Sequence, residues 1–88
     1  MPETRTFVVH DARVEVAIHR GREYDRRVEL CCDDVELVYG VDADHGRIVA
    51  DFLALYQHGE LAAVGADAEQ PAWADTVLNE LDITEVQV

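Results

Sequence analysis

The chain has 88 residues, of which 19 are acidic and 7 are basic, so its formal net charge is −12. All seven basic residues are arginine, and the sequence contains neither lysine nor serine. The length predicts a single domain over residues 1–88, the lack of serine excludes a serine nucleophile, and the acidity argues against nucleic-acid binding, which uses basic surfaces.

Residues 6–42 alternate between apolar and polar side chains, a pattern that predicts four strands with one buried face. Asp11-Ala12 and Asp33-Asp34 are predicted tight turns, and residues 21–25 form a longer connection. The predicted register places Val9 opposite Val14, Ile18 opposite Val28, Leu30 opposite Leu37, and Val28 opposite Tyr39. Every inward residue then faces another inward residue, which predicts an antiparallel meander.

The second half of the chain changes to a helical period. Asp44 is a predicted N-cap and Gly59 a predicted terminator of a first helix. Its apolar stripe would consist of Ile48, Val49, Phe52, Leu53 and Tyr56. Residues 60–70 have no clear pattern.

A second helix is predicted to start at Gln70-Pro71, with Pro71 at its first position. Its apolar stripe would consist of Trp73, Val77, Leu78 and Leu81. The alternating tail from residue 83 to 88 predicts a short final strand. We therefore expect an α+β domain: a four-stranded antiparallel meander with two C-terminal helices packed on one face and a short final strand.

The composition resembles that of cytoplasmic proteins from halophilic archaea over the whole chain. Acidic residues are abundant, arginine replaces lysine, and 13 valines and 11 alanines supply much of the apolar content. The resemblance implies that the charge is an adaptation to a salty solvent. At molar salt the Debye length is about 3 Å, so the repulsion between carboxylates is almost fully screened. The resemblance points to a type of cell and to no protein family.

The cysteines and the distribution of apolar residues indicate where the protein is located and whether it needs a cofactor. Cys31 and Cys32 are adjacent and form no stapling pair, so we expect an intracellular, reduced protein. No secretory signal follows Met1, and no apolar run approaches the roughly 18 residues of a membrane span. We therefore predict a cytoplasmic protein with no membrane association and no cofactor.

Four side chains on the outer face of the predicted sheet form a weak candidate for a metal or thiol site. Cys31 would lie between Glu15 and Glu36, with His19 two rows away. The spacing matches no established metal motif. The two carboxylates would also raise the thiol pKa, which disfavours a nucleophile.

Two other places on the predicted surface are interface candidates. Val8, Ala17 and Val38 are apolar residues on an otherwise charged face, so they predict a contact surface for a homo-oligomer, together with the free edge of the last strand. The loop that contains Tyr24, Arg22 and Arg26 is the one locally basic segment. It could contact a carboxylate-bearing protein, a nucleotide or RNA.

These observations predict a non-catalytic protein-interaction or regulatory module that acts as a homo-oligomer or with another protein. The first alternative is a metal- or thiol-dependent site at Cys31, Glu15, Glu36 and His19. The second is a nucleic-acid-associated regulator or DNA mimic, which is disfavoured because acidic residues run through the whole chain instead of gathering on one face.

Overall fold

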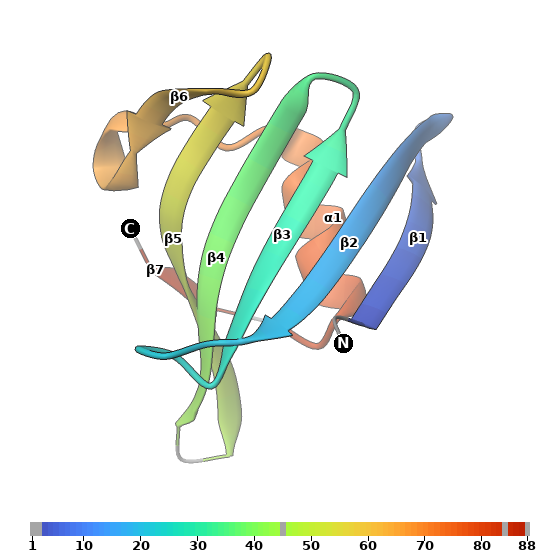
Figure 1. Cartoon of the computed structure of the whole chain (residues 1–88). Coiled ribbons are helices and arrows are strands. Elements are labelled where there is room, and N and C mark those ends of the chain that lie inside the picture. Colours follow the sequence, from blue (N-terminus) through green and yellow to red (C-terminus); the bar gives the residue numbers. More distant parts are fainter. Residues whose placement is uncertain (1–2, 45, 84, 88) are drawn as a thin grey trace.

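The computed structural model describes residues 3–44, 46–83 and 85–87, and most of them belong to one curved antiparallel sheet (Figure 1). Six strands are hydrogen-bonded in chain order, and a seventh pairs with the fifth. The strands are β1 (Glu3–Val9), β2 (Ala12–Arg20), β3 (Arg26–Cys32), β4 (Val35–Asp44), β5 (Arg47–Gln57), β6 (Glu60–Val64) and β7 (Glu85–Gln87). A 3-10 turn at Gly65–Asp67 follows β6, and one helix, α1 (Ala72–Glu80), precedes β7.

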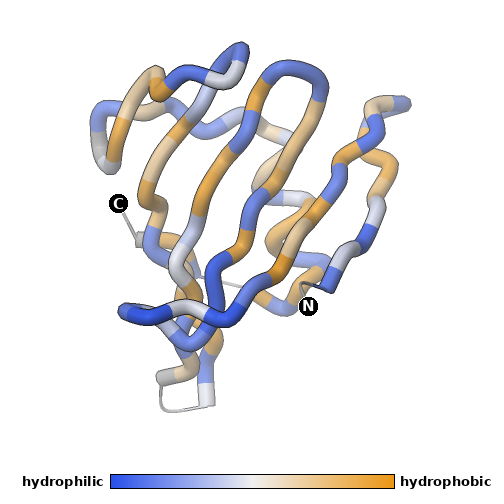
Figure 2. Tube along the Cα trace, viewed as in Figure 1, coloured by the Kyte–Doolittle hydropathy of each residue, from blue (hydrophilic) through white to orange (hydrophobic). Residues whose placement is uncertain are grey.

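The strand pairings predicted for the middle of the meander are confirmed. Ile18 lies opposite Val28, Val28 opposite Tyr39, and Leu30 opposite Leu37. These inward side chains are buried or packed against the core, and the tube in Figure 2 alternates between apolar and polar residues along these strands. Alternation with period two therefore identified both the strands and their shared face.

The first hairpin differs from its prediction by one turn position. The turn is His10-Asp11, which places Phe7 opposite Val14 and Val9 opposite Ala12. His10 and Asp11 both have positive φ, 50° and 66°. Two-residue hairpin turns require this backbone, which Asp tolerates better than Ala12 does. The resulting two-residue change in pairing leaves every side chain on its predicted face.

The predicted fold class is wrong in its second half, because the segment expected to be the first helix is strand β5. Val41 pairs with Ala50 and Tyr39 with Phe52, but Val38 pairs with Ala54, so Leu53 is an extra residue in a β-bulge. The residues of β5 that pack into the core are therefore Ile48, Ala50, Phe52 and Leu55. The bulge breaks the two-residue period, and the apolar outward residues beside it complete a false helical stripe.

The predicted end of that helix is instead a hairpin. His58 and Gly59 have φ of 53° and 79° and connect β5 to β6. Residues 60–64, whose structure the sequence left open, add the sixth strand. A second bulge displaces the β5–β6 register between Leu55 and Tyr56. The architecture is consequently a larger sheet with a single helix, in place of four strands and two helices.

The predicted second helix is confirmed as α1, which lies across one face of the sheet (Figure 1). Pro71 is its N-cap, one residue before the first helical position predicted for it. Ala74, Val77 and Leu78 are buried between the helix and the sheet. Trp73 and Leu81 pack against the same core while remaining partly exposed. In the described parts of the chain, no helix has the length and apolar content needed to span a bilayer.

The core lies between α1 and the inner face of the sheet. Tyr39 is fully buried there, with its ring centroid 5.2 Å from that of Phe52. Its hydroxyl donates a hydrogen bond of 2.7 Å to Oε1 of Gln70, just before α1. This bond satisfies the one polar atom of a buried side chain and links the helix approach to β4.

The tail forms the predicted strand, but with an unexpected partner. β7 runs parallel to β5, with Val49 opposite Glu85 and Asp51 opposite Gln87. It thereby extends the edge of β5 that β6 begins to cover. Of the other residues predicted in this strand, Ile83 precedes β7 and is buried in the core, and residues 84 and 88 lie outside the described residues.

Candidate functional site

The outer face of the sheet, opposite α1, carries the residues that were singled out from the sequence. Glu15, Cys31 and Glu36 are direct cross-strand neighbours on β2, β3 and β4, as the predicted register requires. Cys31 is half-buried, and its pKa is raised by burial and then by Glu36, Glu29 and Glu15. The thiolate is therefore disfavoured at this position, and the row has the opposite of the electrostatics that activate a nucleophilic cysteine.

His19 is held by a residue that was not a candidate. Its Nε2 atom lies 2.7 Å from Oε1 of Glu29, and Nη2 of Arg27 lies 3.7 Å from the other carboxylate oxygen. Glu36 also faces Glu29: its pKa is raised first by burial, then by a hydrogen bond with Glu29 and by repulsion from it. Glu29 therefore links the charged groups on this face.

The candidate metal ligands do not converge on one point. Across residues 3–44, 46–83 and 85–87, no group of three or more His, Cys, Asp or Glu side chains has an arrangement that could hold a metal ion. Glu29 could have been found from the sequence, because the predicted pairing already placed it beside Ala17 and Val38 on the outer face. Its contact with His19 runs diagonally between rows, which the pairing of directly opposed residues does not reveal.

The three apolar interface candidates occupy different environments. Ala17 and Val38 lie in one cross-strand row with Glu29 between them, and Val38 is only 2% exposed. Val8 is 73% exposed, but it lies opposite Arg13 near the C-terminal end of β1, away from the row of Ala17 and Val38. The three side chains therefore do not form one continuous exposed patch. Whether any of them contacts another molecule stays a prediction.

A more exposed apolar pair lies on β6, in the segment that the sequence left undefined. Leu61 is 56% exposed and Val64 is 50% exposed. They pair with Tyr56 and Ala54, which belong to the outer-face rows that contain Glu15 and Ala17. Beyond β6, the described part of the chain supplies no further strand, so one edge of this strand is open.

Tyr24, which belongs to a loop on the predicted surface, is half-buried, and its ring covers a glycine. A Cβ atom placed on Gly40 of β4 would lie 2.3–2.5 Å from three carbons of the ring. The pKa of the phenol is raised, chiefly by a hydrogen bond with Asp51 and then by loss of solvent. The ring therefore fills the space that a side chain at position 40 would occupy.

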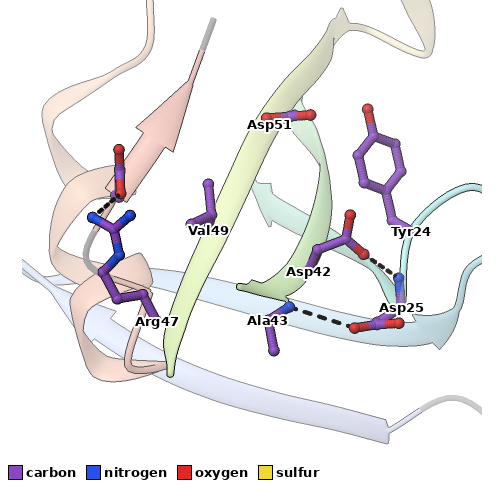
Figure 3. Close-up of a pocket in the computed structure, with 8 residues that line it drawn as sticks. Tyr24, Asp25, Asp42, Ala43, Arg47, Val49 and Asp51 are labelled. Carbon is purple, nitrogen blue, oxygen red and sulfur yellow. Dashed lines mark hydrogen bonds and ion pairs between the residues drawn. The ribbon is translucent and has the colours of Figure 1, made fainter. Parts of the chain in front are cut away.

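Asp25 fixes the same loop to β4. Its backbone N–H donates a 2.6 Å hydrogen bond to Oδ1 of Asp42, and its own Oδ2 accepts one of 3.4 Å from the N–H of Ala43. Figure 3 shows these contacts around a cavity of about 460 Å³. The charged residues that line this cavity are Asp25, Asp42, Asp51, Glu85 and Arg47.

A second cavity, of about 400 Å³, also uses Tyr24 as a wall but has the opposite charge. Arg20, Arg22 and Arg27 line it, with Glu23 as its only acidic residue. Arg26 does not: it lies opposite Val41 and lines a different cavity. Of the two arginines predicted from this loop, the structure therefore brings one, Arg22, to the basic cavity.

Comparisons with protein-family models, with curated proteins and with solved structures found no match for this chain.

Proposed function

We propose that the chain is a non-catalytic protein-interaction module of a high-salt cytoplasm, and that it forms a homodimer through the edge of β6. The observation that carries this proposal is the exposure of Leu61 and Val64 beside an open strand edge. Open edges present unpaired backbone donors and acceptors, and proteins protect the edges they do not use with charge. The opposite edge strand, β1, has that protection: Arg5 forms an ion pair with Glu3 at 2.8 Å.

A second copy is the partner that best fits this edge. Each copy carries a charge of −12, so two copies repel each other over most of their surfaces. Residues 60–64 contain one charged side chain, Glu60, so this edge adds little repulsion of its own. A basic partner would be attracted more strongly to the acidic surfaces elsewhere on the chain.

The edge is also self-complementary. A two-fold axis between Ala62 and Ala63 would join two β6 strands antiparallel and place Leu61 of one copy opposite Val64 of the other. Both side chains lie on the outer face, since they pair with Tyr56 and Ala54. The interface would then contain two Leu–Val pairs, and Glu60 would face Gly65 instead of another acid. Cross-strand apolar pairs contribute about 0.2–1 kcal/mol each, in addition to the new backbone hydrogen bonds.

Sedimentation equilibrium in molar KCl tests the proposal. We expect the wild-type chain to form a dimer and Val64→Glu to shift it to a monomer, because a buried carboxylate would face Leu61. Val8→Glu is the matched control, since Val8 is also an exposed valine but lies on the opposite edge strand. A monomeric wild-type chain, or equal disruption by Val8→Glu, would refute the proposal; thermal melting confirms that both variants are folded.

A further inference from the structure

We propose that the basic cavity beside Tyr24 binds a small phosphate monoester that also contains a flat ring, as a mononucleotide does. This binding site is separate from the proposed dimer edge and does not depend on it. Arg20, Arg22 and Arg27 line the cavity in a chain whose net charge is −12. Four of the seven arginines lie between residues 20 and 27, whereas arginines that only balanced nearby acids would be dispersed like the acids.

Phosphate is the anion to which this side-chain set is best suited. The guanidinium group is planar and offers parallel N–H donors that match two oxygens of one phosphate. Arg27 already lies 3.7 Å from Glu29, which keeps it on the outer face of β3 beside the cavity. Arg20 ends β2 and pairs with Arg26, whose row continues to Val41 on the inner face, whereas Arg22 is the second residue of the loop. Arg22 and Arg27 are therefore the two arginines expected to contact the phosphate.

A flat apolar group is expected beside the phosphate because of the remaining walls. Tyr24 and Leu53 line the same cavity, and Leu53 faces outward because it is the bulged residue of β5. Aromatic and aliphatic walls with a few placed charges are typical of sites for small organic ligands. The volume of about 400 Å³ lies within the range of about 300–1,000 Å³ for such sites.

The loop is held in place by contacts within the chain. Tyr24 rests on Gly40, and Asp25 is bound to Asp42 and Ala43 through its backbone and side chain. A site with this support loses less conformational entropy on binding than a free loop would.

A single nucleotide fits this surface better than a nucleic-acid strand does. On the other side of Tyr24, the neighbouring cavity is lined by Asp25, Asp42, Asp51 and Glu85. The next phosphates of a strand would approach these carboxylates, and the repulsion would oppose the extended electrostatic contact on which RNA binding depends. One phosphate can reach the arginines without this cost.

Isothermal titration calorimetry tests the inference. The full chain is titrated separately with AMP, adenosine and inorganic phosphate at one fixed molar concentration of KCl. We expect AMP to bind about tenfold or more tightly than either fragment, because only AMP uses both the arginines and the apolar wall. Arg22→Ala should weaken AMP binding by about tenfold, the usual effect of losing a charged hydrogen-bond partner. Arg13→Ala is the control: it removes an exposed arginine outside the cavity and should leave AMP binding unchanged.

Several results would overturn the inference. These are the absence of AMP binding at millimolar concentration, phosphate or adenosine binding as tightly as AMP, and equal losses in Arg22→Ala and Arg13→Ala. Tighter binding of a short single-stranded RNA than of AMP would also overturn it, in favour of a polynucleotide surface. A melting curve for each variant shows that the fold is intact, and sedimentation of Arg22→Ala separates this site from dimerisation.

Discussion

Replacing Gly40 with alanine is expected to destabilise the protein, and the only cause is a clash of the new methyl group with the Tyr24 ring. Gly40 lies inside strand β4, paired with Arg27 and Asp51, where any residue can adopt the backbone conformation. Alanine would ordinarily be favoured over glycine there by about 0.5–1 kcal/mol. However, its Cβ would lie 2.3 Å from the nearest carbon of the Tyr24 ring, and the three closest atoms all belong to that ring. The ring must therefore move away.

The expected cost follows from what the ring loses. Overpacking of this kind typically costs about 1–3 kcal/mol. Displacement of the ring would also disturb the interaction with Asp51 that raises the pKa of the Tyr24 phenol. We expect Gly40→Ala to lower the free energy of unfolding by about 1–3 kcal/mol in the wild-type background. In a domain of this size, each kcal/mol lowers the melting temperature by about 4–8 °C.

A double-mutant cycle isolates the contribution of the Tyr24 ring. In the Tyr24→Ala background the obstruction is absent, so Gly40→Ala should become neutral or stabilising by about 0.5–1 kcal/mol. The sign of the effect should therefore reverse between the two backgrounds, a direct measure of coupling between the residues. Urea unfolding at fixed molar KCl, followed by the fluorescence of the single Trp73, gives all four free energies. An equal cost of Gly40→Ala in both backgrounds would refute the role assigned to the ring.

Three further predictions concern the core, the outer face and the charge. Val77→Ala should lower the free energy of unfolding by about 1.5–3 kcal/mol, because Val77 is fully buried. Val8→Ala should change it by no more than about 0.5 kcal/mol, because Val8 is 73% exposed. If urea unfolding gave similar losses of stability for the two variants, the packing of α1 would be contradicted. Glu36→Gln should stabilise the fold at neutral pH and lose that effect in acid. The raised pKa means that the folded state holds the proton more tightly than the unfolded chain does, so ionised Glu36 opposes folding fully above its folded-state pKa. This penalty declines as the pH falls from the folded-state pKa to the lower unfolded-state pKa. A gain that is independent of pH in urea titrations would exclude this cause. The melting temperature should rise substantially between low and molar KCl, since salt screens repulsion within a chain of charge −12; a flat salt profile would contradict the halophilic interpretation of the composition.

The sequence by itself determined the strands of the first half, the pairing of β2 with β3 and of β3 with β4, and the position of α1. In each case the signal was local: alternation with period two for the strands, and Pro71 before a helical stripe for α1. The same register correctly made Cys31 the neighbour of Glu15 and Glu36. Neighbours of this kind need only a strand pattern and a turn position, both of which adjacent residues specify.

Only the tertiary structure decided the conformation of residues 47–64 and the surroundings of the candidate residues. In β5 the bulge at Leu53 gave a strand the spacing of a helix, and pairing with β4 on one side and β6 and β7 on the other stabilised the strand. The contact of Tyr24 with Gly40 joins a loop to a strand, and that of His19 with Glu29 runs diagonally between rows, so neither follows from a pattern that fixes only directly opposed residues. Backbone pairing and side-chain packing across the sheet therefore chose between conformations that the local sequence left nearly equivalent.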